Sequence, residues 1–224
     1  MGSIWHFPME ETGIGQVMFY YHPVFKRLSK SILWENRQRA ITLTFDDGPQ
    51  SKATETALSV LSKYSIKGVF FMLGTSLKQN PMLAAEVVRE GHLVGNHSSS
   101  HRILPLMHYN LMQKNIIECE YLIRDTLGIE SVGFRPPYGL FDHRVISIVK
   151  SINKRIWMFS VDSGDYTNRI DNMLLDRISQ RLKSNSIVLF HDNQACLPLR
   201  TKLLEDTIDY CLDKGYSFST GDTV

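Results

Sequence analysis

The sequence predicts an α/β protein whose parallel strands form a closed or nearly closed barrel. Short apolar segments alternate with segments of helical periodicity from residue 40 onward, which is typical of repeated βα units. Polar clusters follow nearly every predicted strand, whereas an open, doubly wound sheet would place ligands at one switch point. No linker or low-complexity run divides the 224 residues, and barrels of this length are common. The open sheet is the alternative fold.

The first half of the predicted barrel contains three strands. Residues 40–45 are apolar and β-branched, and the segment after them repeats apolar residues at helical spacing (Ala57, Val60, Leu61 and Tyr64). Residues 68–72 have the same strand character. The next helix begins at Asn80-Pro81, because proline is favoured at the first helical position. Residues 93–94 form the third strand.

The second half continues the alternation. A long helix covers residues 110–127 and ends at Gly128, a residue favoured just after helices. Three further strands are each followed by a helix, and a final strand is predicted at 216–218. These strands are 132–134, 156–161 and 186–190, and their helices begin at Asp142, Met173 and Thr201.

The chain is therefore divided into a barrel domain at 40–224 and an N-terminal segment at 1–39. The segment is rich in aromatic residues and is expected to pack on the barrel, without an assignable function. Met1 to Ser3 could be native or a cloning remnant. No basic segment followed by an apolar one opens the sequence, so as written it predicts a cytoplasmic protein. A secreted or cell-surface location is expected if a signal peptide has been replaced.

Composition excludes several classes of partner. The net charge of +2 is too small to indicate nucleic acid binding, and no run of ~18 apolar residues predicts a membrane-spanning helix. The three cysteines are widely spaced, so they predict neither a disulfide framework nor a thiolate zinc site. The oligomeric state is not predicted.

The polar clusters at the strand ends indicate a hydrolytic metal site. Two histidines four residues apart, His97 and His101, combine with a distant aspartate of the Asp46-Asp47 pair into a ligand set of two nitrogens and one oxygen. A divalent metal accepts such a set while keeping positions open for water and substrate. The second aspartate is free to act as a base.

Each cluster also has a purely structural explanation. Asp-Asp-Gly-Pro is typical of a turn, and the histidines could be a surface pair. The segment after Arg135 could be a rigid turn, Asp165 a helix cap, and His191 a partner of Asp192. Their equivalent positions after successive strands favour a shared site over five coincidences.

From about Ala40 to its end the chain resembles the polysaccharide deacetylases of the NodB-homology type, family four of the carbohydrate esterases. The resemblance covers roughly four-fifths of the chain and is carried by five motifs in order: Thr44–Gly48, His97–His101, Arg135–Tyr138, Asp162–Tyr166 and Leu189–His191. One position departs from the family pattern, because Tyr166 stands where tryptophan is usual.

The resemblance implies a distorted (β/α) barrel of about seven parallel strands, NodB-like, and a role for each motif. Asp47, His97 and His101 would hold one divalent ion, Zn²⁺ first, with Co²⁺, Ni²⁺ or Mn²⁺ as alternatives. Asp46 would be the general base, oriented by Arg135, and His191 the general acid, held protonated by Asp165. The oxyanion would be stabilised by the metal and the Tyr138 N–H. The sugar groove would be lined by Pro137, Tyr138, Tyr166 and Leu189.

The implied function is metal-dependent removal of N-acetyl groups from a GlcNAc-containing polymer or oligosaccharide, peptidoglycan- or chitin-like, by hydrolysis of a linear amide. The nearer alternative is an amidohydrolase acting on a small cyclic imide or ureide, or on a lipid-linked sugar. The farther alternative is a non-catalytic saccharide-binding module. The motifs do not identify the substrate or the native metal.

Overall fold

The computed structural model describes residues 31–167 and 173–221. The strands are β1 (Ile32–Leu33), β2 (Thr42–Asp46), β3 (Val69–Met72), β4 (Leu93–Asn96), β5 (Ile156–Trp157), β6 (Val161–Asp162) and β7 (Ile187–His191). The helices are α2 (Ala53–Lys63), α3 (Gly74–Gln79), α4 (Pro81–Arg89), α5 (Tyr109–Leu127), α6 (His143–Ser151), α7 (Met173–Ser179) and α8 (Leu197–Asp213). Single 3₁₀ turns lie at Leu104–Leu106, Pro137–Gly139 and Gln194–Cys196.

The strands form a distorted parallel barrel. Five of them pair in the order β4-β3-β2-β7-β6, and β1 pairs with β5. Phe134 bridges β4 to β5 through Asn96 and Ile156, and all of these pairings are parallel. The segment containing β5 and β6 meets Phe134 at one end and β7 at the other, which closes the ring. This architecture confirms the predicted fold class.

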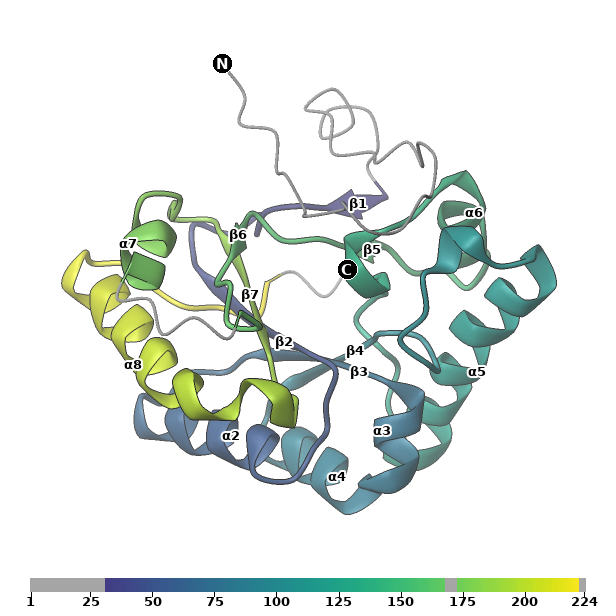
Figure 1. The fold of residues 1–224 in the computed structure, drawn as a ribbon, viewed down its shortest axis with the longest axis horizontal. Helices are drawn as coiled ribbons and strands as arrows, with labels where there is room; N and C mark the ends of the chain where they lie inside the picture. Colours follow the sequence, from purple (N-terminus) through teal and green to yellow (C-terminus); the bar gives the residue numbers. More distant parts are fainter. Residues whose placement is uncertain (1–30, 168–172, 222–224) are drawn as a thin grey trace.

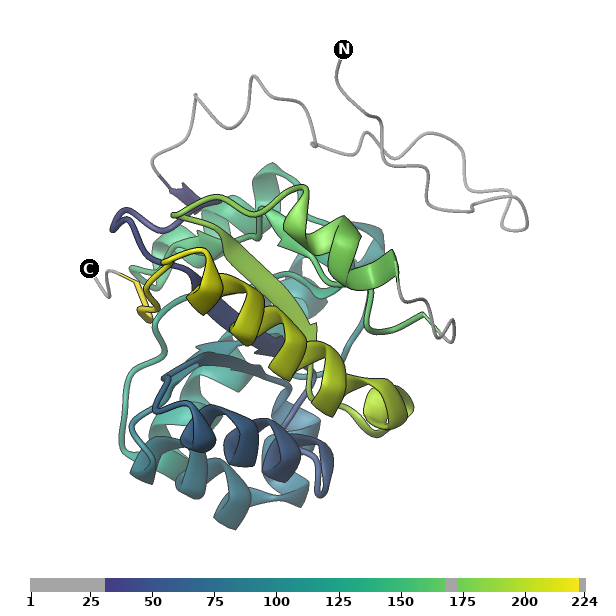
Figure 2. The ribbon, with the colours of Figure 1, turned by 90° about the vertical axis from the view of Figure 1, so that its left-hand side faces the viewer.

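The helices cover the outside of the barrel and the strands lie at its centre (Figures 1 and 2). Strand residues alternate between two environments, as the period of two requires. Outward-facing side chains such as Phe45 and Phe190 pack in a large cluster with α2, α4 and α8. A small inner cluster contains Leu33, Val69, Phe71, Trp157 and Ile187. The barrel interior is therefore a packed core.

Most predicted elements are confirmed with bounds that agree within two residues, and four differ more. Residues 132–134 and 216–218 contribute only single bridges, at Phe134 and Phe218. The strand predicted at 156–161 divides into β5 and β6 because the chain changes partners between them. Helix α8 begins at Leu197, before the predicted Thr201, with Pro198 in its first turn.

Helix α3 was not predicted, since its six residues are too few to show a helical period. Of the N-terminal segment, residues 1–30 lie outside the described part of the chain, so their packing stays a prediction. Within the described ranges, no helix is long and apolar enough to cross a membrane.

Candidate active site

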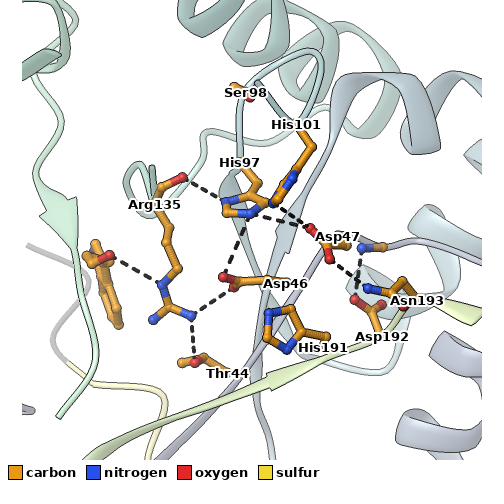
Figure 3. A network of polar contacts seen from close by, with 12 residues as sticks. Thr44, Asp46, Asp47, His97, Ser98, His101, Arg135, His191, Asp192 and Asn193 are labelled. Carbon is orange, nitrogen blue, oxygen red and sulfur yellow. Dashed lines mark hydrogen bonds and ion pairs between the residues drawn. The ribbon is translucent and has the colours of Figure 1, made fainter. Parts of the chain in front are cut away.

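The site lies at the carboxyl ends of the strands, where the sequence places it. The ladder between β2 and β7 pairs Asp46 with His191, so these two residues stand side by side on neighbouring strands. Asp47 and His97 directly follow β2 and β4, and His101 lies in the loop before α5. Figure 3 shows these side chains converging.

Three side chains form a group able to hold a metal. The ligand atoms of Asp47, His97 and His101 all lie within 4.8 Å of one another. Asp47 Oδ1 is 3.5 Å from His97 Nε2 and 3.3 Å from His101 Nε2. This is the ligand set predicted from the sequence.

The donor set fits a divalent cation. The Nδ1 of His97 lies 2.8 Å from the Arg135 carbonyl oxygen, which can only accept, so Nδ1 carries the proton and Nε2 keeps its lone pair. Asp47 Oδ1 is buried and has no hydrogen-bond partner in the structure. A buried carboxylate oxygen left without a donor is costly unless a cation satisfies it.

Electrostatics keep Asp47 ionised. Burial alone raises the pKa of its carboxyl group, but without a metal the positive charges of protonated His97, His191 and His101 hold that pKa well below its usual range. A carboxylate must be deprotonated to bind a metal, so Asp47 is ready as a ligand at neutral pH.

Arg135 fixes the second aspartate from inside the barrel. Its Nη1 donates to Asp46 Oδ1 at 2.8 Å and to Thr44 Oγ at 2.7 Å. The other guanidinium nitrogens donate to the carbonyl oxygens of Trp157 and Met158. Arg135 is fully buried, and its guanidinium lies 4.1 Å from the ring centroid of Phe71. The arrangement locks the carboxylate of Asp46 while leaving Oδ2 toward His97, at 3.8 Å from Nε2.

His191 is paired with Asp165. Its Nδ1 lies 2.7 Å from Asp165 Oδ1, and its backbone N–H donates to Asp165 Oδ2. Burial lowers the pKa of His191, but the charge and hydrogen bond of Asp165 outweigh burial and, with the Asp46 and Asp47 charges, raise that pKa to about 9. His191 is therefore a protonated imidazole beside an ionisable carboxylate, the state that a general acid needs.

The four predicted groove residues differ in exposure. Tyr138 is 55% exposed, and its ring centroid lies 4.3 Å from that of His101. Tyr166 is 44% exposed and meets the His191 ring edge-on, while its hydroxyl donates to Asp162 Oδ2 at 3.0 Å. Pro137 and Leu189 are buried. The two tyrosines are thus the exposed surfaces beside the metal group and the acid.

Two polar residues at the site were not predicted to have a role there. The purely structural explanation of His191 made it a partner of Asp192, but the Asp192 carboxylate binds other groups. Its Oδ1 accepts the Gly48 N–H and its Oδ2 the Thr54 hydroxyl. Asn193 donates from Nδ2 to Asp47 Oδ2 at 2.7 Å. Their place directly after His191, at the carboxyl end of a strand, was the available signal.

The contact between Gly48 and Asp192 predicts a large effect of Gly48→Ala. A Cβ at Gly48 would overlap the buried Asp192 carboxylate. Overpacking of this kind costs about 1–3 kcal/mol, and here it would also displace the metal-ligand loop. We expect a lower free energy of unfolding in urea and a lower metal content.

Gly128→Ala is the matched control, because a Cβ there meets nothing within 4 Å and adds only the strain of φ +67°. Its metal content should equal that of the parent protein. Undiminished metal in Gly48→Ala would contradict the proposed coupling between this contact and the loop.

The comparisons with known proteins agree on one family. The model of the family described as polysaccharide deacetylase matches residues 35–157. The peptidoglycan-N-acetylglucosamine deacetylase PgdA of Listeria monocytogenes is 32% identical over 82% of this chain and 38% of its own length. The peptidoglycan-N-acetylmuramic acid deacetylase PdaC of Bacillus subtilis is 30% identical over 86% of this chain and 40% of its own length. The chain therefore spans about two fifths of each of these relatives.

A solved structure extends the similarity to three dimensions. The crystal structure of the Bc1960 peptidoglycan N-acetylglucosamine deacetylase superposes with a TM-score of 0.80 at 25% identity, over 84% of this chain and 90% of the other. The matches of sequence and fold confirm the resemblance first seen in the five motifs. This chain belongs to the polysaccharide deacetylase family.

Proposed function

We propose that the protein is a metal-dependent hydrolase that removes N-acetyl groups from a GlcNAc-containing polysaccharide or oligosaccharide, with peptidoglycan as the first candidate. The observation that carries the proposal is the buried, unpartnered Asp47 Oδ1 between two imidazoles, beside an aspartate and a protonated histidine. The names of PgdA, PdaC and Bc1960 support peptidoglycan as the polymer. A wall polymer as substrate favours a secreted or cell-surface location.

Asp47, His97 and His101 would hold the cation, and their nitrogen and carboxylate atoms suit Zn²⁺. When bound, the cation supplies Lewis acidity that polarises the amide carbonyl and acidifies water. The remaining steps belong to the protein. Asp46 accepts the proton of the attacking water through the oxygen that Arg135 leaves toward the site.

The amide nitrogen leaves as an amine only after it gains a proton. His191 is the donor, and its Nε2 is available because Nδ1 faces Asp165. Tyr138 and Tyr166 offer exposed aromatic faces to a sugar ring beside this centre. Tyr166 keeps an aromatic surface in place of the usual tryptophan, and its bond to Asp162 fixes that ring.

The paired charge at His191 predicts how activity depends on pH. The value of kcat/KM should fall on the alkaline side as His191 loses its proton. The midpoint of this fall should lie above the ordinary histidine pKa of about 6.5, toward about 9. The positive charge of a cation held by Asp47 would offset part of the increase in the His191 pKa. In Asp165→Asn the carboxylate charge is gone, so the alkaline limb should move to lower pH. An alkaline limb at the parental pH in this variant would separate Asp165 from the acid.

A substrate panel tests the proposed function. Purified protein with added Zn²⁺ or Co²⁺ is incubated with peptidoglycan, chito-oligosaccharides, acetylated xylan and cyclic imides, and acetate or ring-opened product is measured. We expect acetate from an N-acetylated amino sugar, and none from His97→Ala. Ring opening of an imide without acetate release would establish the amidohydrolase alternative. Tight saccharide binding with no product from any substrate would establish the binding module.

A further inference from the structure

The two oxygens of Asp47 have different surroundings. Oδ1 lies toward His97 and His101, at 3.5 and 3.3 Å from their Nε2 atoms, and has no hydrogen bond. Oδ2 accepts the Nδ2–H of Asn193 at 2.7 Å (Figure 3). The carboxylate is thus turned so that one oxygen meets the imidazoles and the other meets an amide donor.

The orientation of the Asn193 amide is fixed by a second contact. Its Oδ1 accepts the backbone N–H of Ala195 at 3.1 Å. Because a backbone N–H can only donate, the oxygen of the amide must lie on that side, and the NH₂ group must face Asp47. The NH₂ group that donates to Asp47 is therefore held in place by the turn at Asn193 to Ala195, in the loop that follows β7.

The backbone around Asp47 is held by other residues. Asp47 has φ +83°, a left-handed conformation that costs energy in a residue other than glycine. Ser76 donates from Oγ to the Asp47 carbonyl oxygen, and Asp192 accepts the N–H of the following Gly48. These contacts fix where the Asp47 side chain starts. Its rotation is fixed by Asn193.

We propose that Asn193 is a positioning residue for the metal ligand Asp47, which it holds with Oδ1 directed at the cation. The inference rests on the proposed metal site. Second-sphere hydrogen bonds of this kind orient ligands, and their loss typically weakens metal binding by about 10–100-fold. The three consecutive residues then have separate roles: His191 is the acid, Asp192 holds the loop of Asp47 through Gly48, and Asn193 holds the Asp47 carboxylate.

The test measures Zn²⁺ affinity directly, without turnover. Each variant is stripped of metal and titrated with Zn²⁺ in competition with a chromophoric chelator. Asn193→Ala removes the donor and should raise the Kd about 10–100-fold. Asn193→Asp keeps an oxygen for the Ala195 N–H but places a carboxylate against Asp47, so its Kd should also rise. Gln194→Ala is the matched control, because the Gln194 side chain is exposed on the same loop. This variant should bind Zn²⁺ with the Kd of the parent protein.

A spectroscopic readout separates orientation from a general loss of structure. The visible absorption of bound Co²⁺ should change in the two Asn193 variants while their melting temperatures without metal stay near that of Gln194→Ala. His97→Ala serves as the reference for the site itself. If His97→Ala binds Zn²⁺ as the parent does, the proposed metal site is wrong. If His97→Ala loses Zn²⁺ but either Asn193 variant binds with the parental Kd, only the role of Asn193 is overturned.

Discussion

Asp46→Asn is expected to lower kcat/KM on an N-acetylated amino sugar by about 10²–10⁴-fold, the usual contribution of a general base. Asparagine has nearly the same shape and can still accept the hydrogen bond from Arg135, but its amide cannot take a proton from water. Because it also removes the charge that balances the buried guanidinium, the free energy of unfolding should fall as well. Asp46 is not one of the three grouped ligands, so the variant should keep its metal. Acetate release and elemental analysis on the same sample measure both properties.

Asp47→Asn is the control for this result. It carries the same chemical change one residue away, on the carboxylate that faces both imidazoles. It should lose metal as well as activity. If Asp46→Asn loses metal to the same extent, the assignment of Asp46 as base and Asp47 as ligand is wrong, and Asp46 belongs to the ligand set.

His191→Ala is expected to cause a loss of similar size on the amide, about 10²–10⁴-fold in kcat. Its loss should be much smaller on an activated acetate ester, because a phenolate leaves without being protonated. The comparison is made on one protein preparation with a chito-oligosaccharide and an aryl acetate. The ratio of the two losses isolates the proton transfer from any change in binding or folding.

Equal losses on the amide and the ester would remove His191 from the role of acid. In that case His191 would support the site by another route, for example by orienting Asp165 through the contact of its Nδ1 with Asp165 Oδ1. The alkaline limb of the pH profile gives an independent check, since it should disappear in His191→Ala if this residue supplies the proton.

The barrel and the positions of the candidate site residues could be predicted from the sequence, because both follow from the order of strands, helices and polar residues along the chain. Asp46, Asp47 and His97 each lie at or just after the end of a buried strand, and parallel strands bring their carboxyl ends to one face. Motif spacing then indicated which side chains could share a metal. The choice of Asp47 over Asp46 came from the family resemblance, and Asp47, His97 and His101 are the three side chains that the structure brings together.

Details that depend on strand pairing and turn geometry were not predictable from the sequence. No local pattern shows that the segment from Ile156 to Val161 changes partners, because both of its ends are apolar and equally suited to a strand. The bond from Asn193 to Asp47 joins residues 146 positions apart and depends on a side-chain orientation set by the Ala195 turn. The exposed fraction of a single side chain was likewise not predictable from the sequence. Leu189 was predicted to line the groove, and in the structure it is buried.

The burial of Arg135 has a consequence for the evolution of such proteins. Asp46 is the carboxylate that balances a guanidinium with no exposed surface, so the base is also the counterion of the barrel core. Losing one member of a buried ion pair typically costs about 3–5 kcal/mol, a large share of the stability of a domain. A descendant that no longer needed catalysis could not discard Asp46 alone without risking its fold. Selection for folding would therefore preserve the base, and its loss should be accompanied by replacement of Arg135.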